Sequence, residues 1–219
     1  MKTTMLLVIV GAGFLSLLLQ AWCSGGEGAG VNAIERLMSQ DQKTRISAHD
    51  ELLAERQRSI RSLLALIEKK SPDSLWLVSG TTESLAISVL GEMRAVEAVP
   101  VLVKWATPPK GGYIVLNLGI SPYDSPAAQA LAKIGKPAEP ALLEVVKQSP
   151  QKMIWSISLS ILQEIEGPKC LEVILEDAIA KETDAAAKAN LQEGLRRLKS
   201  GAGFEPPPGK VEITEPPKS

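Results

Sequence analysis

The sequence feature that most constrains the fold is a helical spacing of apolar residues that recurs along most of the chain. In six segments apolar residues stand at positions i, i+3, i+4 and i+7, which places them on one face of a helix. The segments are 60–67, 86–93, 99–106, 127–134, 138–145 and 171–178. Apolar residues between Ile154 and Ile165 and between Leu191 and Leu198 add two stripes of the same kind. Helices this short are marginal in water on their own, so we expect each to bury its apolar face against other helices.

The connections between these segments and the residue composition point to the same fold class. Most gaps are a few residues long, which favours antiparallel packing of successive helices. Hydrophobic residues make up 45% of the chain but aromatic residues only 4%, and this balance favours helix layers packed through aliphatic side chains over a β-sandwich. The sequence therefore predicts an all-α domain over residues 31–199.

Two parts of this region resemble each other. Residues 84–103 and 125–143 each contain a predicted helix, a glycine, a turn, and a second helix with a proline followed by aliphatic residues. The interval between Pro100 and Pro140 falls in the range that is typical of helical repeats. We expect Gly91 and Gly135 to end the first helices in a left-handed conformation. We expect the two prolines in the first turn of the second helices, where they disrupt no helical hydrogen bond.

The repeated segments carry a family resemblance. They contain Leu90-Gly91 with Ala98-Val99-Pro100-Val101-Leu102, and Ile134-Gly135 with Ala138-Glu139-Pro140-Ala141-Leu142. This pattern resembles the HEAT-repeat family, in particular the short HEAT-like repeats of the phycobilisome-lyase type, with weaker copies at 41–70 and 151–183. The resemblance implies a HEAT-like α-solenoid, a right-handed superhelical stack of about four antiparallel helix pairs. A non-repetitive helical bundle with chance similarity is the alternative.

The N-terminus has the layout of a secretory signal peptide. Lys2 precedes the apolar run Met5–Leu19, and small residues at Ala21 and Cys23 favour cleavage before Ser24. The run is shorter than the ~20 residues that span a bilayer. The sequence therefore predicts export to the periplasm, the cell envelope or the extracellular space.

Two other fates of the N-terminus remain open. The apolar run is an uncleaved anchor in one alternative. In the other, Cys23 is lipidated, as in a bacterial lipoprotein, although Trp22 stands where that signal has a small residue. Residues 24–30 are expected to form a Gly-rich linker, and residues 200–219 a Pro-rich disordered tail.

The sequence offers little that suggests catalysis. The only histidine, His49, has no cluster of other metal ligands near it, and no Gly-x-Ser-x-Gly motif supplies a nucleophile. Cys170 stands among aliphatic residues and is predicted to be a core residue. We therefore expect no catalytic residues, no metal and no cofactor. Lys and Arg number 24 against 25 Asp and Glu, a balance that argues against nucleic acid as a partner.

The family resemblance implies a non-enzymatic module for protein–protein interaction or scaffolding. In such a stack the second helices line the binding face, which implies the candidate partner-binding residues Glu97, Lys104, Glu144 and Lys147. The alternatives are a lipid-tethered structural component of an envelope assembly and a lyase-like cofactor-attachment factor, against which export argues. A membrane is expected to be contacted only through the N-terminal segment.

The segment 107–124 separates the two best repeats and is too long for an ordinary turn between repeats. Tyr113 and Tyr123 lie in this segment and Trp105 lies just before it, in a chain that is otherwise poor in aromatic residues. Because Trp and Tyr are frequent interface anchors, these three are further candidates for partner contact. In the alternative, the aliphatic residues of this segment fold back and cover the core.

Overall fold

The computed structural model describes residues 26–69, 81–107, 125–201 and 204, and all regular structure in them is helical. The elements are α2 (Gly26–Leu37), α3 (Gln42–Ala54), α4 (Arg56–Glu68), α5 (Thr82–Glu92), η1 (Val96–Ala98), α6 (Val99–Ala106), α7 (Pro126–Ile134), η4 (Lys136–Ala138), α8 (Glu139–Gln148), α9 (Lys152–Lys181) and α10 (Ala185–Ser200). The predicted all-α class is confirmed for the described residues.

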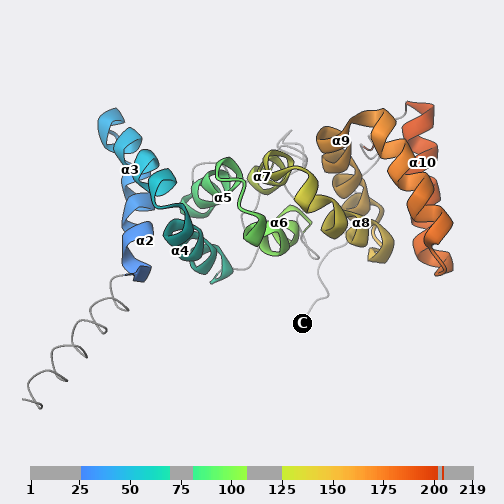
Figure 1. The fold of residues 1–219 in the computed structure, drawn as a ribbon, viewed down its shortest axis with the longest axis horizontal. Helices are drawn as coiled ribbons and strands as arrows, with labels where there is room; N and C mark the ends of the chain where they lie inside the picture. Colours follow the sequence, from blue (N-terminus) through green and yellow to red (C-terminus); the bar gives the residue numbers. More distant parts are fainter. Residues whose placement is uncertain (1–25, 70–80, 108–124, 202–203, 205–219) are drawn as a thin grey trace, which may run out of the picture.

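The helices pack mainly against elements close to them in the chain. Helix α2 contacts α3 and α4, α4 contacts α5, and α5 contacts α7. Further along, α7 contacts α6 and α9, and α8 lies against α6, α9 and α10. Figure 1 shows the same order along the longest axis of the molecule, from α2 and α3 at one end to α10 at the other. The core is therefore a continuous band between successive helices.

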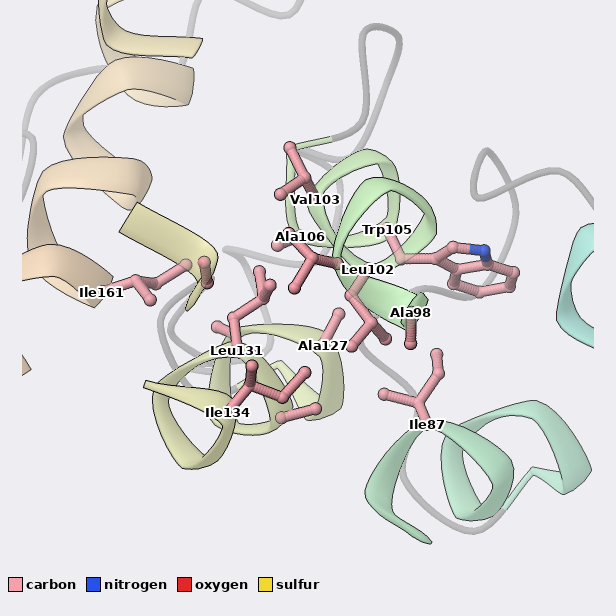
Figure 2. Packing of buried hydrophobic residues seen from close by; sticks show 14 of the residues in the cluster. Ile87, Ala98, Leu102, Val103, Trp105, Ala106, Ala127, Leu131, Ile134 and Ile161 are labelled. Atoms are coloured by element: carbon pink, nitrogen blue, oxygen red, sulfur yellow. The ribbon is translucent and has the colours of Figure 1, made fainter. Parts of the chain in front are cut away.

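The centre of this band joins α5, α6, α7 and α9. Leu102 on α6 and Leu131 on α7 are both fully buried, and Ile87 and Ile161 are 2% exposed. Figure 2 shows Leu131 between the α6 side chains and Ile161 of α9, while Ile87 approaches from α5. The sequence spacing assigns Leu102, Leu131 and Ile161 to the apolar faces of their helices, whereas Ile87 is a buried residue that the spacing does not select.

Four helices begin at a capping side chain. The oxygen of the residue before the helix accepts a hydrogen bond from a nearby backbone N–H in the first turn, which satisfies one of the otherwise unpaired donors. The pairs are Asp41 with Thr44 N (2.9 Å), Thr81 with Ser84 N (3.1 Å), Ser125 with Ala128 N (3.1 Å) and Asp184 with Ala187 N (2.8 Å). These caps fix the starts of α3, α5, α7 and α10.

The two similar sequence segments have matching structures. Their corresponding elements are separated by the same interval as Pro100 and Pro140. The elements η1 and α6 begin at Val96 and Val99, and η4 and α8 begin at Lys136 and Glu139. Ala98 and Ala138 are both fully buried. The prolines lie in the first turn of their helices, as predicted. The second helices of the two copies thus share one register.

The two predicted helix-ending glycines have different roles. Gly135 has φ +79° at the end of α7, a region that favours glycine, although its ψ of −143° lies outside the left-handed helical region. Gly91, in contrast, is a helical residue in the last turn of α5. The residue with positive φ at this helix end is Arg94 (φ +48°), which follows the helix. The prediction for Gly91 is therefore wrong. A Cβ at Gly91 would stand 2.7 Å from the Cα of Ala130, so this glycine allows α5 and α7 to approach closely.

Helix α9 contains a kink at Gly167, where φ is +75° and ψ is +161°, and Pro168 follows directly. The apolar spacing of residues 171–178 predicts a separate helix after this proline, and the kink separates two helical halves there. Figure 1 shows the change of direction along α9. The two halves of α9 are thus two helices that are joined directly at Gly167.

Gly167→Ala is expected to destabilise the protein by about 1–3 kcal/mol, because this backbone region is essentially restricted to glycine. A Cβ would meet no atom of the described residues within 4 Å, so the loss would report backbone strain rather than a clash. Chemical unfolding measures it, with the exposed Lys169→Ala at the same kink as a control expected to stay within about 0.5 kcal/mol. Equal stabilities of the two variants would contradict the assigned backbone conformation.

Both ends of the helical region differ from the predicted boundaries. Helix α2 starts at Gly26, within the segment expected to be a linker, because glycine lowers helix propensity without excluding a helix that packs on α3 and α4. At the other end, Phe204 is 4% exposed and belongs to the core, although it falls in the segment predicted to be disordered. Apart from Phe204, the residues after Gly201 lie outside the described residues.

Candidate interaction surface

The predicted partner-binding residues of the second helices lie on neighbouring elements. Lys104 on α6 and Glu144 on α8 are exposed, and they occupy equivalent repeat positions in helices that contact each other. Glu97 is also exposed, on η1 just before α6. We call Glu97, Lys104 and Glu144 the second-helix row. It presents charges of both signs.

Lys147, the fourth predicted residue, has a partner within the chain. Its Nζ lies 3.0 Å from Oε2 of Glu182, at the end of α9, and its side chain is only partly exposed. Backbone hydrogen bonding from Asp184, followed by the Lys147 side chain, lowers the pKa of Glu182. Lys147 therefore ties α8 to the end of α9 and is less available to a partner than Lys104.

The structure gives a different environment to Trp105. Its side chain is 7% exposed, and Figure 2 shows the indole beside Ala98, on the side of α6 away from Leu131. Trp105 is therefore a core residue here, not an exposed anchor, because it falls on the buried face of α6. Tyr113, Tyr123 and Cys23 lie outside the described residues.

The turns within successive helix pairs are connected by side chains. Arg56 Nε, at the start of α4, donates to the carbonyl oxygen of Met93 at 3.2 Å. Glu92 Oε1 lies 3.8 Å from Lys133 Nζ, which joins the ends of α5 and α7. Figure 1 shows α4, α5 and α7 in this order along the molecule. We call the edge formed by these turns and the α9 kink the turn edge.

The turn edge continues to the kink through Glu166. Its Oε2 lies 3.7 Å from Nζ of Lys136 on η4. The Glu166 side chain is 6% exposed, whereas that of Lys136 is 80% exposed. Oε1 of Glu166 is buried and has no hydrogen-bond partner in the described part of the chain. The sequence analysis did not single out Glu166. One sequence signal could have indicated it. A carboxylate precedes Gly167, whereas the apolar Ile134 precedes Gly135 in the segment before.

His49 is not the isolated solvated residue that a lone histidine in a helix suggests. Its Nε2 lies 2.7 Å from Oε2 of Glu92, which connects α3 to α5, and its Nδ1 lies 3.5 Å from Oδ1 of Asp50. The hydrogen bond to Glu92 is the main cause that raises the pKa of His49 above its ordinary value of 6.5. Glu92 thus bridges His49 and Lys133 from the two neighbouring pairs.

This bridge predicts a pH dependence of stability. A histidine whose pKa is raised by folding adds stability below its unfolded pKa and loses it as the pH rises through the folded value. Because both side chains are more than a third exposed, the contribution is expected to stay below about 1 kcal/mol. Urea unfolding at pH 5.5 and pH 8.5 should show a smaller difference for Glu92→Gln than for the unchanged protein. Identical pH profiles would contradict the bridge.

The α9–α10 contact contains a second charged network. Arg197 lies over the ring of Trp155 at 5.2 Å, and its Nε donates to Oε1 of Glu193 at 3.0 Å. Arg196 donates to both oxygens of Glu193 at 2.7 and 2.8 Å. The hydrogen bonds from Arg196 and then Arg197 lower the pKa of Glu193 to about 2. Glu193 therefore holds Arg197 in place on the indole.

The remaining features of the described residues concern metal ligands, the free cysteine and the length of the helices. No group of three or more potential metal ligands occurs among the described residues. Cys170 is exposed, contrary to the predicted core position, because it falls in the first turn after the kink. None of the helices in the described ranges combines the length and apolarity that crossing a bilayer requires.

Comparison of the chain with family models, with curated proteins and with solved structures finds no significant match.

Proposed function

We propose that the helices form a HEAT-like, right-handed α-solenoid that acts as a non-enzymatic module for protein–protein interaction or scaffolding. The observation that supports this most strongly is the matching register of η1/α6 and η4/α8, within helices that pack in chain order. Stacked repeats that contact only their neighbours leave extended surfaces for binding. Among these surfaces, the second-helix row supplies repeated exposed charges.

The second-helix row is suited to select a partner more than to bind it tightly. Exposed charges at the rim of an interface change association rate and specificity, whereas each exposed ion pair contributes about 0–1 kcal/mol. The alternation of Glu97, Lys104 and Glu144 calls for a partner surface with the opposite alternation. A partner with one dominant charge sign would be repelled at one position or more.

Site-specific photo-crosslinking tests this function. A photoreactive residue at position 104 or 144 is expected to capture the same partner protein, while one at the exposed position 43 on α3 captures it at least several-fold less. Lys104→Glu is expected to weaken binding of that partner about five-fold, which corresponds to about 1 kcal/mol. The matched control is Lys43→Glu on α3, for which unchanged affinity is expected. Equal capture from positions 104 and 43 would contradict a binding surface on the second helices.

We also propose that the protein is exported, on the basis of the apolar run Met5–Leu19 and the small residues after it. Intact mass measurement of the protein from its native cell distinguishes the outcomes. A chain starting at Ser24 supports cleavage, a chain starting at Cys23 with a lipid mass supports tethering, and a full-length chain contradicts both.

A further inference from the structure

We propose that Glu166 receives the guanidinium group of an arginine side chain from a partner protein. The proposal rests on the proposed function and identifies a contact on the turn edge that neither the repeat pattern nor the second-helix row contains. It arises from a buried carboxylate oxygen that no described residue pairs with.

The burial of Glu166 costs free energy that the described residues do not recover. Its side chain is 6% exposed, and Oε1 makes no hydrogen bond to any of them. Leaving a buried polar group unpaired is destabilising, and more so when the group is charged. The cation that faces it, Nζ of Lys136, is 3.7 Å from Oε2, too far for a hydrogen bond. The carboxylate is therefore only weakly compensated by the described part of the chain.

At two other turns of the chain, an apolar residue occupies the place directly before a residue with positive φ. Ile134 directly precedes the positive-φ Gly135 and is 5% exposed. Met93 precedes the positive-φ Arg94 and is 7% exposed. Glu166 stands at the corresponding place before Gly167, where φ is again positive. A carboxylate thus replaces a core side chain in one of these three units. Such departures from local consistency are expected at functional positions.

Arginine is the group that best satisfies this carboxylate. Its planar fork of N–H donors can bond both oxygens of a carboxylate, and its weaker hydration suits a buried pair. Because Oε1 is buried, such a pair requires the carboxyl group of Glu166 to turn toward the side on which Lys136 lies. A Cβ at Gly135 or at Gly167 would meet no atom of the described residues within 4 Å, their own chain neighbours aside. The exposed Lys136 side chain acts as a weak internal substitute, and an incoming guanidinium would displace it.

The stability of two variants separates this role from a structural one. Glu166→Ile introduces the side chain found at position 134 and removes a weakly compensated carboxylate. We expect its thermal midpoint to rise by about 2–4 °C. Lys136→Met is expected to shift the midpoint by less than this. A drop of several degrees for Glu166→Ile would show that the carboxylate stabilises the fold, and would overturn the proposal.

Binding is measured by NMR titration of the full chain with N-acetyl-arginine methylamide. Saturable shifts of the Gly135 and Gly167 amides are expected with this probe. They should be at least ten-fold weaker with the neutral citrulline analogue and with the Glu166→Gln variant. Glu164→Gln is the control, because Glu164 is an exposed carboxylate on the same helix, and its titration should match that of the unchanged protein. Equal shifts with citrulline, or in Glu166→Gln, would overturn the proposal.

The probe needs no partner protein, so the failure of this inference is distinct from the failure of the proposed function. Absence of arginine binding together with partner capture at positions 104 and 144 would overturn only the role of Glu166. Arginine binding without partner capture would overturn only the second-helix surface.

Discussion

Trp155→Ala is expected to lower the free energy of unfolding by about 3–5 kcal/mol, the largest effect that we expect of any single substitution in this chain. Trp155 lies on the first half of α9 and is 2% exposed, so its removal leaves a large cavity among α9 and its neighbours. The variant also removes the ring on which Arg197 lies at 5.2 Å. Urea unfolding followed by circular dichroism measures the loss.

Two controls separate the cavity from other effects. Val173→Ala truncates a 64% exposed side chain on the second half of the same helix and is expected to change stability by less than about 0.5 kcal/mol. Arg197→Met keeps the ring but removes the cation, and should cost about 1 kcal/mol. A loss for Trp155→Ala no larger than that for Val173→Ala would show that the indole is not in the core.

The second large effect is expected at Gly91, where alanine should destabilise the protein by about 1–3 kcal/mol. The added Cβ would stand 2.7 Å from Cα and 2.8 Å from Cβ of Ala130, and backbone atoms cannot move away as a side chain can. The strain would exceed the roughly 1 kcal/mol that alanine gains over glycine in a helix. Thermal and chemical unfolding measure the net change.

Gly194→Ala is the matched comparison for this close approach. Its Cβ would also meet an atom at 2.7 Å, but that atom is Cδ1 of Leu159, the end of a side chain that can turn. We therefore expect a smaller loss at Gly194 than at Gly91. A stabilised Gly91→Ala variant would contradict the close packing of α5 on α7.

The sequence predicts most helices of the fold because their apolar spacing directly reflects which face is buried. The residues that the spacing selects in 127–134, among them Ala130 and Leu131, are buried in α7. The positions of Pro100 and Pro140 also follow from local chemistry, since a proline without an amide hydrogen fits the first helical turn.

The errors arise where a residue's role depends on contacts between helices. Gly91 has the local context of a helix end, yet its role is set by Ala130 on another helix. Trp105 is of a residue type that often anchors interfaces, but it lies on the buried side of α6. Glu166 has the sequence context of an ordinary helix carboxylate, and only its burial, with no hydrogen-bond partner for Oε1 among the described residues, distinguishes it. None of these features is encoded in the spacing along one helix.

Hydrogen exchange of the full chain carrying Leu191→Ala tests the central claim, that the helices are stabilised by their neighbours in the chain, most directly. Leu191 is fully buried on α10, which packs on α8 and α9. If stability is transmitted only between adjacent units, exchange should accelerate in α8, α9 and α10 while the amides of α2 to α5 keep their rates. An equal acceleration from α2 to α10 would instead indicate one cooperative core and would contradict the repeat architecture.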